Sequence, residues 1–257
     1  MFDLGPFDHE RHAVLDSTNS EALRRVSQGG IKRPTILSAV QQTAGRGSRQ
    51  REWFSHSGNV HATFMIPVIE QRRETFLVVY PLALATSKTI RDMSGLGARV
   101  TLKWPNDVLV DGRKVSGSLH EVGWHEGKAT LIAGIGINMT WAPAAADVMF
   151  PPAALTDFVI EIPPAETAIE MLASTIRSEL DLWIREGFDR VRQRYHAEAF
   201  LLHESITLRE RTEGATNRSG IYRGIDEDGA LVLESETGWS KHYAVDIFPT
   251  LSTLAGD

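Results

Sequence analysis

The sequence has no cysteine, and that absence removes several kinds of chemistry. Disulfides, thiolate metal sites and mechanisms with a cysteine nucleophile are excluded. Long hydrophobic runs are missing too, because polar residues break each apolar segment well short of the ~20 positions that a membrane-spanning helix needs. The start, residues 1–16, carries neither a signal-peptide nor a transit-peptide pattern. We therefore expect a cytoplasmic protein with no membrane partner.

An excess of positive charge is also absent. The formal net charge is −6 at pH 7, which opposes general attraction to a phosphate backbone. Nucleic acid is therefore not the expected partner. The chain has 257 residues, of which 42% are hydrophobic and 23% charged, so it can bury a substantial core. We expect a soluble, globular protein with two unequal domains.

The first part of the chain predicts alternating strands and helices. Residues 11–16 indicate a short strand, followed by a helix that Thr18 caps and Glu21 joins in a capping box. A second apolar run at 36–40 leads into a Gly- and Arg-rich loop at 42–52. The strand after this loop repeats apolar residues with period two, at Val60, Ala62, Phe64 and Ile66.

The middle of the chain predicts a helix and then a meander. Residues 75–93 carry an apolar helical pattern that Pro81 interrupts. Beyond a further strand, Asp111-Gly112 is suited to a two-residue type I′ turn, and a second turn follows at 125–127. The three runs around these turns therefore predict a three-stranded antiparallel meander.

The last part of the chain changes character. An amphipathic helix is indicated from Ile169 to Trp183, with a second helix around 188–201. Short strands separated by turn residues make up the remainder. We therefore predict an α+β protein, with a mixed or antiparallel sheet flanked by helices in residues 1–201 and a small β-barrel in residues 202–257.

The loop at residues 42–55, QTAGRGSRQREWFS, suits an anion. Gly45 and Gly47 let backbone N–H groups approach a ligand closely. Permanent charge and forked donors for carboxylate or phosphate come from Arg46, Arg49 and Arg51. The composition fits a solvated basic loop equally well, and a nucleic-acid loop is the third alternative.

KWPND, residues 103–107, and the strand after it add polar side chains. Asn106 and Asp107 would point into a site, where Asp107 accepts a proton from an attacking amine or helps to hold Mg²⁺. Lys114 follows the hairpin turn, and Gly117 leaves room for a ligand against its strand. The alternatives are a plain turn and a solvated strand lysine.

GIGIN, residues 134–138, is not a dinucleotide fingerprint, because the third glycine and the following helix are missing. Together and in order, however, these segments resemble the catalytic domain of the biotin protein ligase family. Asp16-Ser17-Thr18-Asn19 is similar to its biotin-contacting D-S-T-N turn, and residues 42–55 to its Q-T-A-G-R-G-R-x-G-R-x-W-x-S loop. KWPND, Lys114 with Gly117 and Glu121 behind it, and GIGIN complete the resemblance. Residues 224–234 resemble the SH3-like domain that ends many of these ligases.

The resemblance implies a class II synthetase-like ligase domain with a C-terminal SH3-like barrel. It also implies an enzyme that joins biotin to ATP, releases pyrophosphate and holds biotinyl-5′-adenylate until a lysine of a biotin carboxyl carrier protein attacks. Two anionic reactants require charge neutralisation, which Arg46, Lys114 and Mg²⁺ would provide. Asp107 is the third catalytic candidate, and the metal ligands stay unassigned.

The resemblance divides the other site residues into two groups. The biotin-binding group is Ser17, Thr18, Asn19, Gln42, Gly45, Gly47, Ser48 and Gly117. The nucleotide-binding group is Arg49, Arg51, Trp53, Asn106, Gly134 and Asn138. In this assignment Trp53 covers or stacks near the nucleotide, and Asn138 supports the site.

The chain departs from the family pattern at several positions. Ser48 stands where the family repeats arginine, and Gln50 where it has glycine. A charge-assisted contact is worth roughly 1.5 to 3 kcal/mol, so its loss would loosen the adenylate by about one to two orders of magnitude unless a neighbouring arginine substitutes. The hydroxyls of Ser116 and Ser118 either favour a more polar acid or face away from the ligand.

Three functions are weighed against one another. The first is a biotin protein ligase of the class without an N-terminal DNA-binding domain, because the residues before Asp16 are too few for a helix-turn-helix with its own core. The second is a lipoate- or octanoate-type acyl ligase or transferase, whose thiol-dependent branch the lack of cysteine excludes. The third is a non-catalytic ligand-binding relative, which Ser48 and Gln50 keep open. A homodimer is left open as well.

Overall fold

The computed structural model describes residues 1–47, 51–70, 73–144, 149–209, 217–243 and 245–249. The larger sheet contains β1 (Asp8–Leu15), β2 (Thr35–Gln42), β3 (Val60–Val68), β4 (Val100–Lys103), β5 (Asp107–Val110), β6 (Arg113–His125) and β7 (Lys128–Ile137). The smaller sheet contains β8 (Ser205–Arg209), β9 (Arg218–Ile225), β10 (Leu231–Ser235), β11 (Gly238–His242) and β12 (Asp246–Pro249). The helices are α1 (Thr18–Gly29), α2 (Val79–Ser94), α3 (Ala165–Glu186) and α4 (Phe188–Glu198), with 3₁₀ turns η2 (Arg73–Val78), η3 (Gly97–Arg99) and η4 (Leu155–Asp157).

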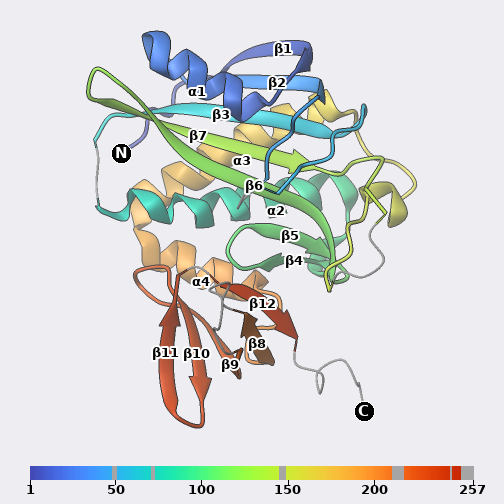
Figure 1. The fold of residues 1–257 in the computed structure, drawn as a ribbon, viewed down its shortest axis with the longest axis vertical. Coiled ribbons are helices and arrows are strands. Elements are labelled where there is room, and N and C mark those ends of the chain that lie inside the picture. Colours follow the sequence, from blue (N-terminus) through green and yellow to red (C-terminus); the bar gives the residue numbers. More distant parts are fainter. Residues whose placement is uncertain (48–50, 71–72, 145–148, 210–216, 244, 250–257) are drawn as a thin grey trace.

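The larger sheet is mixed, with strand order β1-β2-β3-β7-β6-β5-β4. β1 and β2 run parallel, and the other neighbouring pairs run antiparallel. α1 lies on one face of this sheet, and α2 and α3 lie on the other (Figure 1). The predicted mixed sheet flanked by helices is therefore confirmed. The predicted meander is β5-β6-β7, and its first turn has positive φ angles at Asp111 (47°) and Gly112 (75°).

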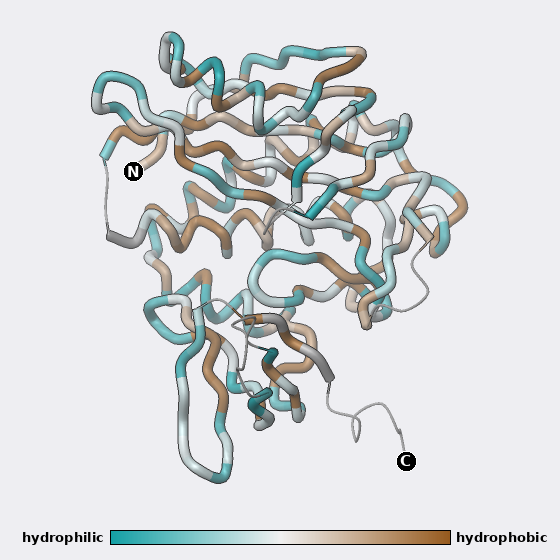
Figure 2. The backbone as a smooth tube through the Cα atoms, in the orientation of Figure 1, coloured by the Kyte–Doolittle hydropathy of each residue, from teal (hydrophilic) through white to brown (hydrophobic). Residues whose placement is uncertain are grey.

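The inner strand β3 is buried on both of its faces. The predicted period-two residues belong to one apolar cluster, which also includes Leu82 of α2 and Ile176 of α3. Met65 points the other way, into a smaller cluster with Ala22 and Val26 of α1. Figure 2 shows the corresponding concentration of hydrophobic backbone in the strands and helices at the centre of the molecule. Apolar residues on both faces place β3 in the middle of the sandwich.

The N-terminal cap of α1 differs from the prediction by one residue. Ser17, not Thr18, is the cap, and its side chain accepts a hydrogen bond from the backbone N–H of Ser20 at 3.4 Å. The hydroxyl of Thr18 lies instead beside Gln42 and Thr63. Ser17 and Thr18 are both good capping residues, so the local sequence alone does not distinguish them.

The predicted helices are present, with shifted boundaries. The pattern at 75–93 becomes η2 and then α2, so the break falls at Val78 and Pro81 lies in the first turn of α2. Proline is tolerated there because the N–H groups of a first helical turn have no intrahelical acceptor. The helix around 188–201 ends at Glu198. None of the helices in the described ranges combines the length with the apolar content that crossing a membrane requires.

The β-rich tail forms a five-stranded antiparallel sheet with order β11-β10-β9-β8-β12. It lies beside α4, at the lower end of the molecule in Figure 1. Its apolar residues join the same cluster as those of α2 and α3. Two polar contacts also cross this boundary: the hydroxyl of Tyr80 donates to the carbonyl oxygen of Gly229, and His196 Nε2 accepts from the backbone N–H of Ile225 at 2.8 Å. The tail is thus packed firmly against the helical layer.

Candidate active site

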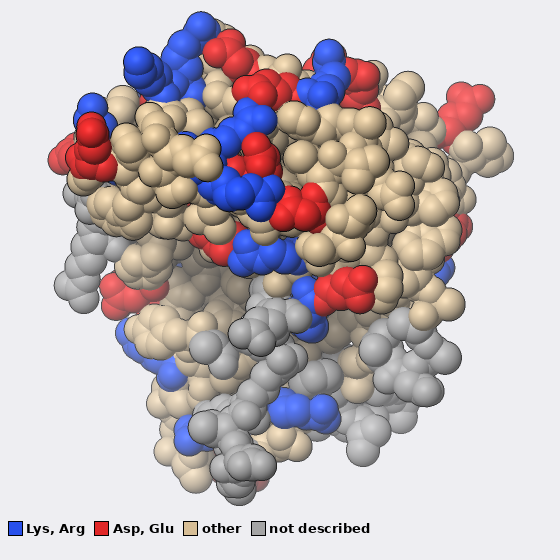
Figure 3. Space-filling model, turned by 45° about the horizontal axis from the view of Figure 1, so that its top comes forward, with Lys and Arg blue, Asp and Glu red and all other residues tan. Residues whose placement is uncertain are grey.

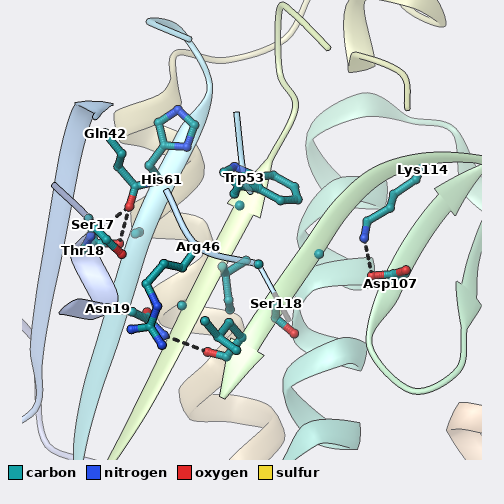
Figure 4. A pocket seen from close by; sticks show the side chains of 17 residues that line it. Ser17, Thr18, Asn19, Gln42, Arg46, Trp53, His61, Asp107, Lys114 and Ser118 are labelled. Carbon is teal, nitrogen blue, oxygen red and sulfur yellow. Dashed lines mark hydrogen bonds and ion pairs between the residues drawn. The ribbon is translucent and has the colours of Figure 1, made fainter. Parts of the chain in front are cut away.

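One pocket on the α1 side of the larger sheet collects most of the predicted site residues (Figure 4). It encloses about 480 Å³ of space between atoms, part of it open to solvent. Its lining comes from the start of α1, the loop after β2, and strands β3, β5, β6 and β7. The predicted residues that line it are Ser17, Thr18, Asn19, Gln42, Arg46, Gly47, Trp53, Asp107, Lys114, Gly117 and Gly134.

Uncharged polar side chains at one end of the pocket hydrogen-bond one another. The backbone N–H and the hydroxyl of Thr18 donate to Gln42 Oε1 at 2.8 and 3.2 Å. Gln42 Nε2 donates to Ser55 Oγ at 3.1 Å, which fixes the orientation of the amide. Thr63 Oγ1 lies 2.8 Å from Thr18 Oγ1 and 2.6 Å from Asn19 Oδ1. Most of these groups are buried, so the network holds the start of α1 against β2 and β3.

Asn19 and Arg46 share one carboxylate. Glu121 Oε2 accepts from Asn19 Nδ2 at 3.0 Å, and Glu121 Oε1 accepts from an Arg46 guanidinium nitrogen at 2.7 Å. Arg46 also donates to Ser20 Oγ at 3.3 Å. The Arg46 side chain is 41% exposed and that of Glu121 is 22% exposed. The predicted arginine is therefore oriented by β6 but can still be reached by a ligand.

A second cation lies at the opposite end of the pocket. Lys114 Nζ is 2.7 Å from Asp107 Oδ1, and Lys103 Nζ is 3.5 Å from Asp107 Oδ2. Burial alone would raise the pKa of Asp107, but the charges of Lys114 and Lys103 outweigh it and hold the pKa below its usual value. Asp107 therefore stays ionised. The ring of Trp53 lies 5.9 Å from Lys114 Nζ, which places the aromatic ring beside the cation.

Glycines on β6 and β7 bring the backbone close to the pocket. Gly117 and Gly136 face each other in register across these strands. A Cβ atom at Gly136 would lie 2.4 Å from the Trp53 ring, and one at Gly134 would lie 2.1 Å from Asn19 Oδ1. Contacts this short do not occur between real atoms, so both positions require glycine for this arrangement. The absence of side chains here lets Trp53 and Asn19 lie directly on the sheet.

Several predicted residues lie next to the pocket rather than in it. Gly45 and Arg51 line an adjoining hollow, which shares Arg46 and Gly47 with the pocket. Asn106 Nδ2 donates to the carbonyl oxygen of Ser118 at 2.6 Å, and Asn138 is buried at the end of β7. Ser48 and Arg49 of the predicted set, with Gln50, lie outside the described residues.

The two serines that depart from the family pattern differ in orientation. Ser116 is buried, and its hydroxyl donates to the carbonyl oxygen of Gly136 at 2.7 Å, so it faces the backbone. Ser118 lines the pocket, and its Oγ accepts from Asn106 Nδ2 at 3.2 Å. Of the two hydroxyls, that of Ser118 is therefore the one placed to affect a ligand.

Other pocket residues were not singled out from the sequence as site residues: His61, Ala62, Leu119 and Ile135. His61 and Thr63 alternate along β3 with the apolar residues that were recognised. Polar residues at alternating positions of a strand usually indicate a solvated face. Here that face is covered by α1 and the pocket loops, so the same pattern marks the lining of a site.

Charged side chains alternate in sign around the start of α1. Arg24 donates to both carboxylate oxygens of Asp16 at 2.8 Å, and this bond lowers the pKa of Asp16 to about 2. Glu21 accepts from Arg24 and Arg25. Figure 3 shows basic and acidic side chains interleaved across this part of the surface. The first residue of the D-S-T-N turn is thus tied to the helix that follows it.

Comparisons with known proteins agree with this geometry. Residues 12–138 match the model of the biotin/lipoate A/B protein ligase family. The chain is 33% identical over 243 residues to a biotin–acetyl-CoA-carboxylase ligase of Paracoccus denitrificans, covering 92% of this chain and 98% of that protein. It is 30% identical over 250 residues to the bifunctional ligase/repressor BirA of Bacillus subtilis, covering 92% of this chain and 72% of that protein.

The same agreement extends to a solved structure. The biotin protein ligase of Aquifex aeolicus in complex with biotin and ATP superposes with a TM-score of 0.79 at 22% sequence identity, covering 95% of this chain and 99% of that chain. At this identity the likeness concerns the fold, which includes the mixed sheet and its flanking helices.

Proposed function

This chain belongs to the biotin/lipoate A/B protein ligase family, and we propose that within it the chain is an ATP-dependent biotin protein ligase. The biotin carboxylate attacks the α-phosphate of ATP, which gives biotinyl-5′-adenylate and pyrophosphate. The amine of a carrier lysine then attacks the acyl carbon, and AMP leaves as the amide forms. The observation that carries this proposal is a single pocket in which neutral hydrogen-bonding groups lie at one end with Arg46 beside Asn19, and the cation of Lys114 lies at the other end.

We assign Lys114 to the oxygens between the acyl group and the phosphate, and Arg46 to the carboxylate or the α-phosphate. Both reactants are anionic, so fixed cations lower the repulsion between them and stabilise the charge of the transition state. The carboxylates of Asp107 and Glu121 support these assignments, since they hold the two cations in place before substrate arrives. Trp53 lies between Lys114 and Gly136, where it can cover the nucleotide.

Asp107 is proposed to act on the proton of the carrier amine. While Lys114 is paired with it, its lowered pKa makes it a weak base. When Lys114 turns toward the adenylate phosphate, the larger of the two lysine charges that lower the pKa moves away, while Lys103 and the effect of burial remain. The pKa of Asp107 then rises, so that it becomes a better acceptor at the step that needs one.

Magnesium would enter with the triphosphate of ATP, whose charge it neutralises. Within the described part of the pocket lining, Asp107 supplies the carboxylate, and Lys103 and Lys114 already neutralise its charge. We therefore assign the ion to the phosphates and propose no protein ligand for it. The remaining predicted nucleotide contacts, from Arg51, Asn106, Gly134 and Asn138, stay proposals of the same kind.

The chain is proposed to divide into a catalytic domain, residues 1–201, and an SH3-like barrel, residues 202–257. The antiparallel tail sheet and the turn at Asp228-Gly229, where Gly229 has a φ of 77°, support this division. The tail shares an apolar cluster with α2 and makes hydrogen bonds to α2 and α4, so the two parts would form one packed unit.

The proposed macromolecular partner is the biotin-carrying domain of a carboxylase. The name of the Paracoccus relative, a ligase for acetyl-CoA carboxylase, supports this choice. We propose the cytoplasm as the compartment, with no role for membranes or nucleic acid; the net charge of −6 argues against the latter. Light scattering with and without biotin and MgATP would measure whether the chain forms a homodimer.

One experiment tests the function directly. The protein is incubated with MgATP, a biotin carrier domain and one acid at a time from biotin, lipoate and octanoate, and the carrier is then weighed by mass spectrometry. We expect pyrophosphate release and a carrier mass increase with biotin alone. Modification by lipoate or octanoate would assign the chain to an acyl ligase of that type. Binding of biotin without pyrophosphate release would identify a non-catalytic relative.

A further inference from the structure

His61 is a buried polar residue that the assignments above leave unused. It lies on β3, its residue is 2% exposed, and it lines the pocket. Its strand partner in register is Gly136, whose partner on β6 is Gly117. Residues paired in this way point to the same face of a sheet, so the two positions beside His61 carry no side chain. No side chain of β7 lies beside the imidazole there; the Trp53 ring takes the space over Gly136, and Lys114 takes the space beside Gly117.

The hydrogen bonds of the imidazole define which nitrogen carries the proton. His61 Nε2 lies 3.2 Å from the carbonyl oxygen of His56. A carbonyl oxygen can only accept, so Nε2 is the protonated nitrogen and Nδ1 presents a lone pair. Burial lowers the pKa of His61, which keeps the ring neutral near pH 7. Nδ1 is buried, and within the described part of the chain nothing donates to it.

An unpaired buried acceptor is costly, and most such atoms in folded proteins have a donor. The position of His61 in the pocket indicates which end of a ligand could supply the missing donor. Figure 4 shows His61 on the same side of the pocket as Gln42 and Thr18, away from Lys114 and Asp107. With the acid end of a substrate assigned to Lys114, His61 faces the opposite end. A substrate that satisfies Nδ1 must carry an N–H or O–H donor there.

We propose that His61 is a specificity-determining residue whose Nδ1 accepts a hydrogen bond from a ureido N–H of biotin. This proposal rests on the proposed function and names the group that distinguishes the substrate. Biotin and lipoate both end in a pentanoate chain, but biotin carries a cyclic urea with two N–H donors and lipoate carries a dithiolane with none. Octanoate has no polar group at that end. His61 thus selects for biotin among acids that the cationic end would accept alike.

Two substitutions separate this role from a structural one. His61→Phe keeps a planar ring and removes the acceptor, whereas His61→Asn places an amide oxygen close to the position of Nδ1. Isothermal titration calorimetry measures the Kd of each protein for biotin, for lipoate and for MgATP. We expect His61→Phe to weaken biotin binding by about tenfold and His61→Asn by less than about threefold, because one lost hydrogen bond with an unpaired partner has that magnitude. Lipoate and MgATP binding should stay within about twofold of the parent.

The outcomes are distinguishable from failure of the proposed function. If the parent protein binds no biotin, the function itself fails. If the parent binds biotin and His61→Phe binds it equally well, or if His61→Phe and His61→Asn lose biotin and lipoate equally, the role of His61 is refuted. Should His61→Phe not fold, a tenfold loss in folded His61→Asn also refutes it. In ¹⁵N spectra of the parent, the Nδ1 signal, assigned by its absence in His61→Asn, should shift with biotin and not with lipoate; no shift with biotin contradicts the proposal.

Discussion

At the α1 end of the pocket uncharged side chains hydrogen-bond one another and Arg46 lies beside Asn19, whereas at the β5–β6 end Lys114 is paired with Asp107. Thr18, Gln42 and Thr63 form an uncharged network that is largely buried. Lys114 and Arg46 are partly exposed, with 25% and 41% of their side chains accessible. The first end is preorganised for a neutral group, while the second holds a cation whose partner a substrate anion can replace. Substitutions at the two ends should therefore affect different steps.

The largest effect is expected at Lys114. Lys114→Ala removes the cation at the forming acyl phosphate, and losing one such group costs about 10² to 10³ in rate. Pyrophosphate release with biotin and MgATP should fall by this factor, while the Kd for biotin changes by less than about fivefold. Lys128→Ala, at the exposed start of β7, is the matched control and should behave as the parent. Full activity of Lys114→Ala would refute the role given to this lysine.

The neutral end should respond through binding rather than rate. Gly134→Ala places a methyl group 2.1 Å from Asn19 Oδ1, which forces the amide out of its position. Overpacking of this kind costs about 1 to 3 kcal/mol, so the Kd for biotin should rise by about 10- to 100-fold. Calorimetry checks this value. Gly29→Ala is the control, because a methyl group at this end of α1 meets nothing within 4 Å; an unchanged Kd in Gly134→Ala would mean that Asn19 does not contact the ligand.

Glu121 joins the neutral group of Asn19 to the cation of Arg46, and its removal should affect binding and rate modestly. Glu121→Ala releases Asn19 and Arg46 together. Because the ion pair is partly exposed, solvent screens it, and we expect about a 5- to 10-fold loss in kcat/KM for adenylate formation. Glu121→Gln keeps an acceptor for Asn19, so it should recover biotin affinity but not the rate. If both variants equal the parent in rate and affinity, Glu121 does not position either residue.

The smallest effect concerns stability at low pH. The pKa of Asp16 is lowered from 3.8 to about 2 by its bonds with Arg24. A lowered folded-state pKa contributes stability above the unfolded value, and this contribution is lost as the pH falls through the folded value. The melting temperature of Asp16→Asn should therefore approach that of the parent as the pH falls from about 4 to about 2. A constant difference between the two proteins across this range would show that the Asp16 charge has no part in stability.

Much of the fold followed from local patterns, because turns and amphipathic helices depend on residues close in sequence. The positive φ angles at Asp111 and Gly112 are one example. The alternation of apolar and polar residues along β3 was recognised from the sequence. Such an alternation shows that the two faces of the strand differ. It does not show whether water or another layer of the protein covers the polar face. His61 was missed for that reason. The pairing of Arg46 with Glu121 joins residues 75 positions apart, and no local pattern encodes such a partner.

The candidate site residues were predicted from the resemblance of several short segments, in order, to one family, and most of them line the pocket. Glycines interrupting β7 indicated close packing, and Gly134 and Gly136 indeed receive Asn19 and Trp53. The capping residue of α1 was predicted as Thr18 but is Ser17. Thr18 instead hydrogen-bonds to the side chain of Gln42, which lies at the end of a strand distant in sequence. Side-chain choices of this kind are made by tertiary neighbours, so they are the part that sequence patterns leave undetermined.

The indole N–H of Trp104 donates to the hydroxyl of Tyr80 at 3.0 Å, and that hydroxyl donates to the carbonyl oxygen of Gly229 in the tail sheet. Trp104 is the second residue of KWPND, three positions before Asp107. The C-terminal strands thus support, through Tyr80, the KWPND segment that ends at Asp107. Shortening the chain before this sheet would leave the Tyr80 hydroxyl, the acceptor of the Trp104 indole, without its own acceptor, so the tail takes part in positioning KWPND.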